Sequence, residues 1–169
     1  MLMLFSQQLL GSVQEQLRQV PSKERFYLEA YFKDFLLHNL LGHVVFFETK
    51  PACIICVSVA SGRQPFLKKS ISEGWSCWKK YEAFFSHPNF IFCEEEHTFE
   101  TGKLLEIILI NKQTLAKCLA QNASIFKEIL GEEFSVEEFM TRLEEEKKLS
   151  PLIHHDECLL GIILGFGYE

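Results

Sequence analysis

Proline and glycine are scarce in this chain, which has only five of the first and nine of the second among 169 residues. These counts exclude collagen-like repeats and low-complexity chains, both of which need far more of one or the other. Apolar residues make up 47% and charged residues 24%, as in an ordinary globular protein. We therefore expect residues 1–169 to form one globular domain, with a helical section (1–42) and an α+β section (43–169).

Long apolar runs are also missing, because no segment reaches the roughly 18 apolar residues of a membrane span. Residues 1–5 are apolar, but no basic residues precede them and residues 6–8 are polar, unlike a cleavable export signal. The sequence therefore predicts a cytoplasmic protein without a transmembrane segment, whose six cysteines remain free thiols. Secretion by a route that needs no signal is also compatible with this pattern.

Basic residues do not dominate the charge of the chain. The 17 lysines and arginines are outnumbered by 23 acidic residues, which leaves a net charge of −6. Nucleic-acid binders typically carry a basic surface, so we expect no nucleic-acid partner. Two runs of three glutamates, at 94–96 and 144–146, are typical of a solvated surface.

The common catalytic motifs are absent too. The sequence contains no G-x-S-x-G serine elbow, no G-x-x-x-x-G-K-[ST] phosphate loop, no H-E-x-x-H zinc motif and no EF-hand loop. Their absence favours a non-enzymatic binding or protein-interaction module without a cofactor. Six cysteines and six histidines allow many Cys–His pairs, so such a pair by itself does not indicate a nucleophile.

Phenylalanine, by contrast, is abundant, with sixteen residues against four tyrosines and two tryptophans. Its ring supplies a large buried area without needing a hydrogen-bond partner, which favours a phenylalanine-packed core. A second alternative is a pocket lined by these rings, which would make the protein a carrier of an apolar small ligand.

Hydrophobic spacing predicts an α+β fold: a small antiparallel sheet of about four strands flanked by helices, in the order α-α-β-β-α-β-β-α-α-α. Helices are expected over 6–20, 23–37, 72–85, 112–130 (with a break near Asn122), 135–148 and 155–164. Strands are expected over 44–48, 52–60, 90–94 and 104–110, with residues 95–103 as the connection between the last two.

Two of these helices carry more apolar surface than one core contact needs. The helix over 23–37 has a second apolar row beside its main stripe, and the last helix is apolar almost throughout. An extended apolar surface is typical of a protein–protein interface, so we expect a protein partner or self-association. The interface candidates are Phe32, Phe35, Leu36, Leu160 and Ile163.

Two groups of residues could bind metal. His154, His155 and Asp156 form the densest cluster of ligand types, and they suggest an alternative function as a metal-dependent hydrolase that holds zinc or another divalent ion. Asp156 could instead cap the last helix. Cys53 and Cys56 have C-x-x-C spacing, but residues three apart on a strand point to opposite faces, which opposes chelation.

Five stretches of the chain are distinctive in combination: TKP at 49–51, GWSCWKKY at 74–81, NFIF at 89–92, INK at 110–112 and LLGIILGFG at 159–167. Together they resemble a family of uncharacterised proteins from chlamydia-like and other intracellular bacteria, over roughly residues 45–169. The resemblance implies a bacterial, host-associated origin and a natural chain that continues past the final glycines. It implies no activity, cofactor or site residue.

Overall fold

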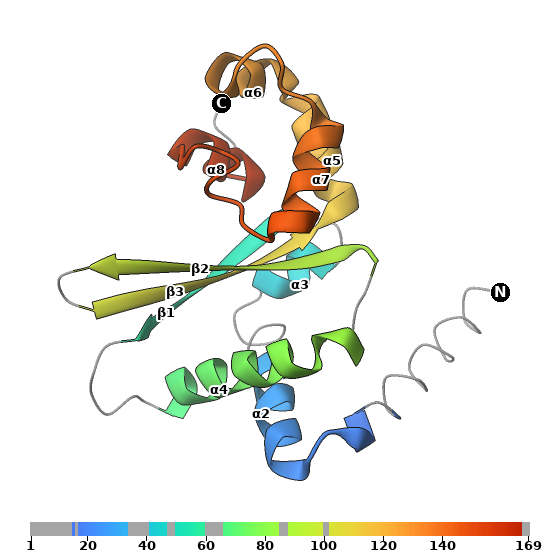
Figure 1. Cartoon of the computed structure of the whole chain (residues 1–169), viewed down its shortest axis with the longest axis vertical. Helices are drawn as coiled ribbons and strands as arrows, with labels where there is room; N and C mark the ends of the chain where they lie inside the picture. The colour runs from blue at the N-terminus through green and yellow to red at the C-terminus, as the bar shows by residue number, and fades with distance from the viewer. Residues whose placement is uncertain are drawn as a thin grey trace.

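A three-stranded antiparallel sheet lies at the centre of the computed structural model, which describes residues 15, 17–33, 41–46, 50–59, 66–84, 88–99 and 102–166. The strands are β1 (Ala52–Val59), β2 (Phe90–Phe99) and β3 (Gly102–Asn111), in the order β1-β3-β2. Helices α2 (Ser22–Lys33), α3 (Leu41–Phe46) and α4 (Phe66–Tyr81) pack on one side (Figure 1). Helices α5 (Lys112–Gln121), α6 (Ala123–Leu130), α7 (Val136–Glu146) and α8 (Glu157–Ile163) pack on the other.

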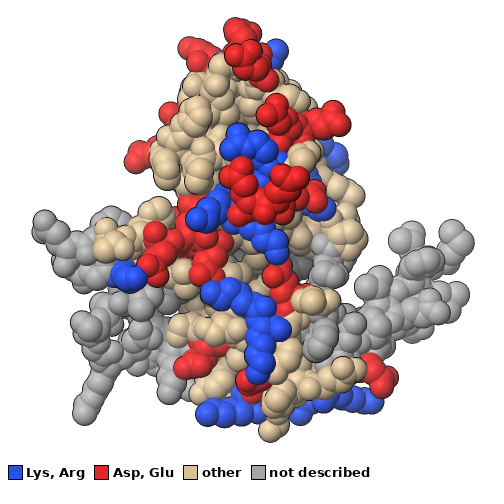
Figure 2. Space-filling model, in the orientation of Figure 1, with Lys and Arg blue, Asp and Glu red and all other residues tan. Residues whose placement is uncertain are grey.

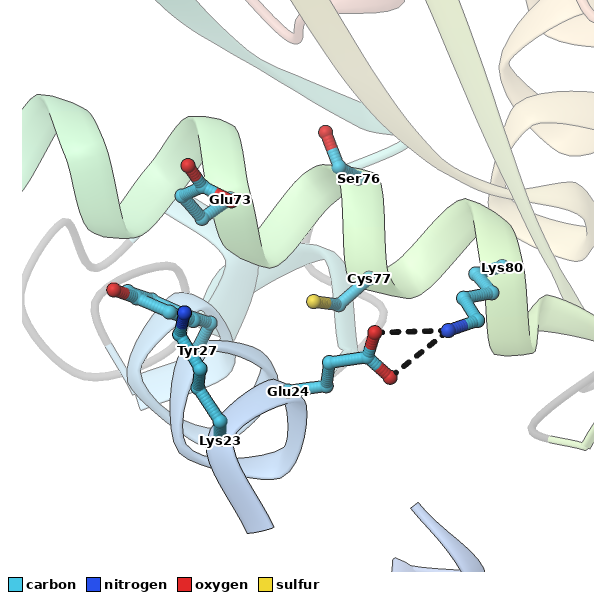
Figure 3. Close-up of a pocket in the computed structure, with 7 residues that line it drawn as sticks. All are labelled: Lys23, Glu24, Tyr27, Glu73, Ser76, Cys77 and Lys80. Carbon is cyan, nitrogen blue, oxygen red and sulfur yellow. Dashed lines mark hydrogen bonds and ion pairs between the residues drawn. The ribbon is translucent and has the colours of Figure 1, made fainter. Parts of the chain in front are cut away.

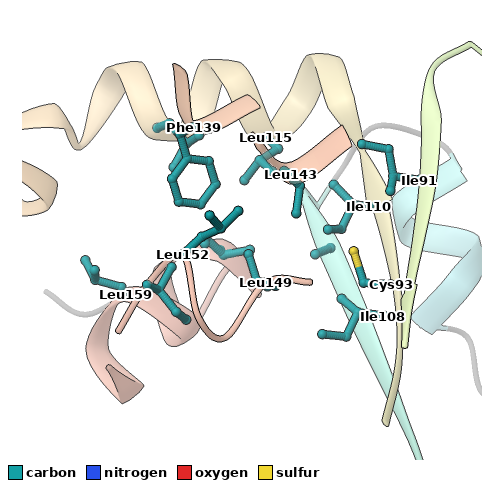
Figure 4. Packing of buried hydrophobic residues seen from close by; sticks show 14 of the residues in the cluster. Ile91, Cys93, Ile108, Ile110, Leu115, Phe139, Leu143, Leu149, Leu152 and Leu159 are labelled. Atoms are coloured by element: carbon teal, nitrogen blue, oxygen red, sulfur yellow. The ribbon is translucent and has the colours of Figure 1, made fainter. Parts of the chain in front are cut away.

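The sheet is buried on both faces because its apolar residues do not alternate with polar ones over the first half of β1 and the second half of β3. Even-numbered residues of β3, such as Ile108 and Ile110, pack under the C-terminal helices together with Cys93 (Figure 4). The odd-numbered Ile107 and Leu109 pack against the N-terminal helices. Because side chains alternate between the two faces, β3 contributes residues to both cores.

Sequence signals predict the caps of α5 and α7 and the break between α5 and α6, although α7 ends at Glu146, earlier than expected, and α8 begins at Glu157, later than expected. The Asn111 side chain caps α5 by accepting a hydrogen bond from the Thr114 N–H at 3.1 Å. Asn122 separates α5 from α6, which confirms the predicted break. Ser135 caps α7 by accepting from the Glu138 N–H at 3.4 Å. These local signals were sufficient because a cap depends only on neighbouring residues.

Helices α2 and α4 approach each other closely at Gly74. A Cβ atom there would collide with the Tyr31 Cβ and would lie 2.6 Å from the Tyr27 carbonyl oxygen. Beside this contact, the ring of Trp78 lies 5.1 Å from those of both Phe32 and Phe92, between ring centres. Glycine therefore allows the two helices to bring their aromatic residues together over the sheet.

Two predictions about the sheet are wrong. Residues 44–48 were expected to form a strand, but α3 covers Leu41–Phe46, so the sheet in the described part of the chain has three strands instead of about four. Val45 is fully buried in this helix, and the Asn111 side-chain amide donates to its carbonyl oxygen at 3.3 Å. Short apolar runs are ambiguous between helix and strand, and here packing against β1 and β3 decides.

The hairpin between β2 and β3 is also tighter than expected, because both strands extend to a Phe99–Gly102 pair. Most of the predicted 95–103 connection is therefore strand. The other strand predictions and the mixed α and β content are confirmed, and α4 begins at Phe66, earlier than expected. The predicted helix over 6–20 lies largely outside the described residues. None of the helices in the described ranges combines the length and apolar character needed to cross a membrane.

Candidate functional site

A row of polar side chains crosses the sheet where the apolar core under the C-terminal helices ends. Glu106 of β3 lies directly opposite Cys56 of β1 and directly opposite Glu95 of β2. His97 follows Glu95 by two residues and therefore points to the same face. We call Glu95, His97 and Glu106 the sheet-end site.

The sheet-end site has the spacing of a metal centre. One ligand atom from each of its three residues lies within 4.8 Å of the other two. The His97 Nε2 and Glu106 Oε2 atoms are 3.2 Å apart. Two ligands on a tetrahedral zinc ion, with bonds of roughly 2.0–2.1 Å, are about 3.3 Å apart. The separation of this pair is close to that of two ligands on such an ion, and a Glu95 carboxylate oxygen lies within 4.8 Å of both ligand atoms.

Glu95 is the fixed member of the site, with only 7% of its surface exposed. Its Oε1 accepts hydrogen bonds from the backbone N–H groups of Leu149 at 2.7 Å and Ser150 at 2.8 Å. These two donors belong to the turn between α7 and α8. A carboxylate offers about four lone-pair positions, so these two bonds hold Glu95 in place and leave capacity for a metal ion.

The other acidic side chains of β2 pair with lysines. Glu94 lies 2.7 Å from Lys79 of α4, and Glu96 lies 2.6 Å from Lys103 of β3. In Figure 2 acidic groups gather over the sheet, next to basic ones. The run of three glutamates was expected to be solvated, and this is wrong for Glu95, because the middle residue of a run on a strand points opposite to its neighbours.

Cys56 lies at the edge of the site, on the side of Glu106 away from His97. Its Sγ donates a weak hydrogen bond to Glu106 Oε1 at 3.8 Å, while His97 contacts Oε2. Partial burial, followed by the charge of Glu106, raises the pKa of the Cys56 thiol above its usual value. A protonated thiol is a poor nucleophile.

The order of these groups also opposes nucleophilic catalysis. In a catalytic triad the histidine lies between the nucleophile and the carboxylate and takes the proton from the nucleophile. Here the Glu106 carboxylate lies between the thiol and the imidazole. The arrangement therefore suits ion binding better than covalent chemistry.

The residues that the sequence suggested as metal ligands lie at the start of α8 and in the turn before it. Asp156 caps α8, because its Oδ1 accepts from the Leu159 N–H at 2.9 Å. His154 and His155 are exposed turn residues with left-handed backbone angles, φ 52° and 56°. Among the described residues, the sheet-end site is the one group in which three ligand atoms lie close enough to bind a single ion.

The cap gives a direct prediction. Asp156→Ala should lower the free energy of unfolding by about 1 kcal/mol, because the first turn of α8 loses an acceptor for one of its free N–H groups. Urea denaturation measures this difference, and Glu157→Ala, at the next and exposed residue, is the control. An Asp156→Ala variant as stable as the wild type would show that the cap contributes nothing.

The interface candidates that the structure describes pack in or against the two hydrophobic cores. Ile163 is fully buried, and Leu160 packs against the same C-terminal core. Phe32 packs against the core on the other face of the sheet. Phe35 and Leu36 lie outside the described residues. For the candidates that the structure describes, the extra apolar surface is therefore explained by packing against the two faces of the sheet.

The C-x-x-C pair behaves as the strand geometry predicts. Cys53 is buried among the residues facing α2 and α4, whereas Cys56 points to the opposite face and contacts Glu106. Burial raises the pKa of Cys53 to about 12. The two thiols therefore cannot chelate one ion.

A groove of about 280 Å³ lies between α2 and α4 (Figure 3). Charged residues, Ser76, Tyr27 and Cys77 line it, and none of the lining residues is a phenylalanine; the full set is Lys23, Glu24, Tyr27, Glu73, Ser76, Cys77 and Lys80. Glu24 and Lys80 form an ion pair at 2.8 Å, and the Tyr81 hydroxyl donates to the same carboxylate. Hydrogen bonds from Lys80 and Tyr81 lower the pKa of Glu24. This charged groove is not the phenylalanine-lined pocket that an apolar-ligand carrier requires.

Sequence reasoning missed all the members of the sheet-end site. A signal exists in the alternation Cys93, Glu95, His97, which continues a core-facing row into polar residues. That signal identifies a face of one strand only. Glu106 lies beside these residues because β2 pairs with β3, and the sequence of neither strand alone predicts this pairing.

The chain was compared with known proteins as a whole. No protein-family model, curated protein or solved structure matches it. The chemistry of its own side chains is therefore the basis on which its function can be inferred.

Proposed function

We propose that the chain is a divalent-metal-binding protein whose ion is held by Glu95, His97 and Glu106. The observation that carries the proposal is the clustering of their ligand atoms within 4.8 Å, on two neighbouring strands. Carboxylate oxygen and imidazole nitrogen are both established ligands of zinc and of other divalent ions. Binding without catalysis also agrees with the lack of catalytic motifs in the sequence.

Electrostatics supports a cation at this position. Glu95 and Glu106 are directly opposite each other, and like charges at paired positions destabilise a sheet. A divalent ion between them would convert this repulsion into two attractions. Glu95 is buried, and a buried charge needs compensation. The two N–H groups of the α7–α8 turn supply part of it, and the ion would supply the rest.

The test is isothermal titration of zinc chloride into protein stripped of metal with a chelator. We expect one equivalent to bind to the wild type. His97→Ala should weaken binding at least about tenfold, because even the loss of a partner that only orients a ligand costs 10–100-fold. Thermal stability should rise with zinc in the wild type and not in the variant.

The matched control is the double variant His154→Ala with His155→Ala, which removes two exposed imidazoles from the turn before α8. It should bind zinc as the wild type does. Loss of binding in this control, with retention in His97→Ala, would contradict the proposal and favour the hydrolase site predicted from the sequence. No binding by the wild type would also contradict it.

A further inference from the structure

Cys56 continues the sheet-end site onto the third strand. Its Cα is paired with that of Glu106, and its Sγ already contacts Glu106 Oε1 at 3.8 Å. The residue is exposed, so its side chain has room to turn about the Cα–Cβ bond. Cys56, Glu106 and Glu95 therefore form a row in which each strand of the sheet contributes one potential ligand.

We propose that Cys56 supplies the fourth ligand of the ion and closes a site of one sulfur, one nitrogen and two oxygen ligands; this inference rests on the proposed metal-binding function. Sγ lies beside the Oε1 of Glu106, while His97 contacts Oε2, and Sγ is not among the three ligand atoms that lie within 4.8 Å of one another. Coordination thus requires the thiol to rotate and the Glu106 carboxylate to re-aim. The thiol proton passes to solvent, a sulfur lone pair forms the bond to the metal, and no oxidation or reduction occurs.

A sulfur ligand defines the class of ion. Thiolates are soft ligands, which favour zinc, cobalt and cadmium over magnesium, calcium and manganese. Glu95 and Glu106 alone would also suit the harder ions. The site should therefore bind zinc and cobalt much more tightly than manganese, and removal of the thiol should reduce this preference.

The fourth ligand also defines the role of the ion. Catalytic zinc sites keep one position open for water, whereas structural sites have four protein ligands. An ion held by Cys56, Glu106, Glu95 and His97 would join β1, β3 and β2 beyond the end of the apolar core. It would link the three strands near the middle of their pairing, and this extends the binding proposal to a non-catalytic role.

Cobalt provides the test, because a thiolate bound to cobalt gives a near-ultraviolet charge-transfer band that oxygen and nitrogen ligands do not give. Metal-free protein is titrated with cobalt chloride in wild-type form and as Cys56→Ser and Cys158→Ser. Cys158 is the other exposed cysteine and serves as the matched control. We expect the band in the wild type and in Cys158→Ser, and its loss in Cys56→Ser with at least a tenfold weaker affinity for zinc.

The outcomes separate the two proposals. One equivalent of bound cobalt without the band, or with a band that Cys56→Ser retains, would overturn the role of Cys56 and leave the metal-binding function intact. No binding of zinc or cobalt by the wild type would overturn both. Thiol labelling in the Cys158→Ser background gives a second readout if it is followed at the peptide that contains Cys56, because Cys118 is half-buried: zinc should slow the modification of Cys56, and an unchanged rate would overturn its role.

Discussion

Gly74→Ala should destabilise the chain by about 3 kcal/mol or more, which corresponds to a fall in Tm of about 6–12 °C. The added methyl group would collide with the Tyr31 Cβ and approach the Tyr27 carbonyl oxygen, both on α2. Alanine is favoured over glycine by about 1 kcal/mol in a helix, so a simple propensity argument predicts the opposite sign. The steric effect should be larger, because the Tyr27 oxygen belongs to the backbone and the Tyr31 Cβ is bonded directly to it, so neither can move aside as the end of a flexible side chain can.

The matched control is Ser76→Ala, two residues further along α4 and exposed. It should change the free energy of unfolding by less than about 0.5 kcal/mol. Thermal denaturation followed by circular dichroism compares the three proteins. A Gly74→Ala variant as stable as the wild type would show that α2 and α4 do not meet at this glycine.

Glu95→Leu should be comparably damaging in metal-free protein. The leucine removes the acceptor of two buried backbone N–H groups, and each unsatisfied group costs about 1–3 kcal/mol. Relief of the repulsion from Glu106 offsets part of this loss, so we expect a net loss of about 2–4 kcal/mol. Glu95→Gln keeps an acceptor oxygen and should lose less than half as much.

Urea denaturation in the presence of a chelator measures these differences without the contribution of a bound ion. Glu96→Gln is the matched control, since Glu96 is the exposed neighbour and its ion pair with Lys103 lies on the surface. Such a pair contributes about 0–1 kcal/mol. If Glu95→Leu were as stable as Glu96→Gln, the carboxylate would not be needed to hold the α7–α8 turn against the sheet.

The elements that the sequence predicts well are those specified by neighbouring residues. Asn122, Ser135 and Asp156 each interrupt or cap a helix through contacts within a few positions, and the structure has all three. Helix α3 was missed because its conformation depends on contacts with β1 and β3, which are distant in sequence. Its β-branched and aromatic residues favour a strand, and tertiary packing overrides that preference.

The sheet-end site could not be predicted for a related reason. Glu95 belongs to a run of glutamates that suggests a solvated surface, and the buried member is identified only by the direction of its side chain on β2. Its partners are Glu106, eleven residues away, and the backbone of Leu149 and Ser150, more than fifty residues away. Cys56 lies on a third strand, β1, which is more distant in the sequence and pairs with β3. Only the register of three strands brings these groups together.

The most direct test of the account is a crystal grown with zinc, measured on both sides of the zinc absorption edge. Anomalous differences then locate the ion without assumptions about its ligands. The account predicts one strong peak about 2.0–2.2 Å from carboxylate oxygens of Glu95 and Glu106 and from Nε2 of His97. A peak at His154 and His155 instead, or no peak between Glu95, His97 and Glu106, would contradict the metal-binding function.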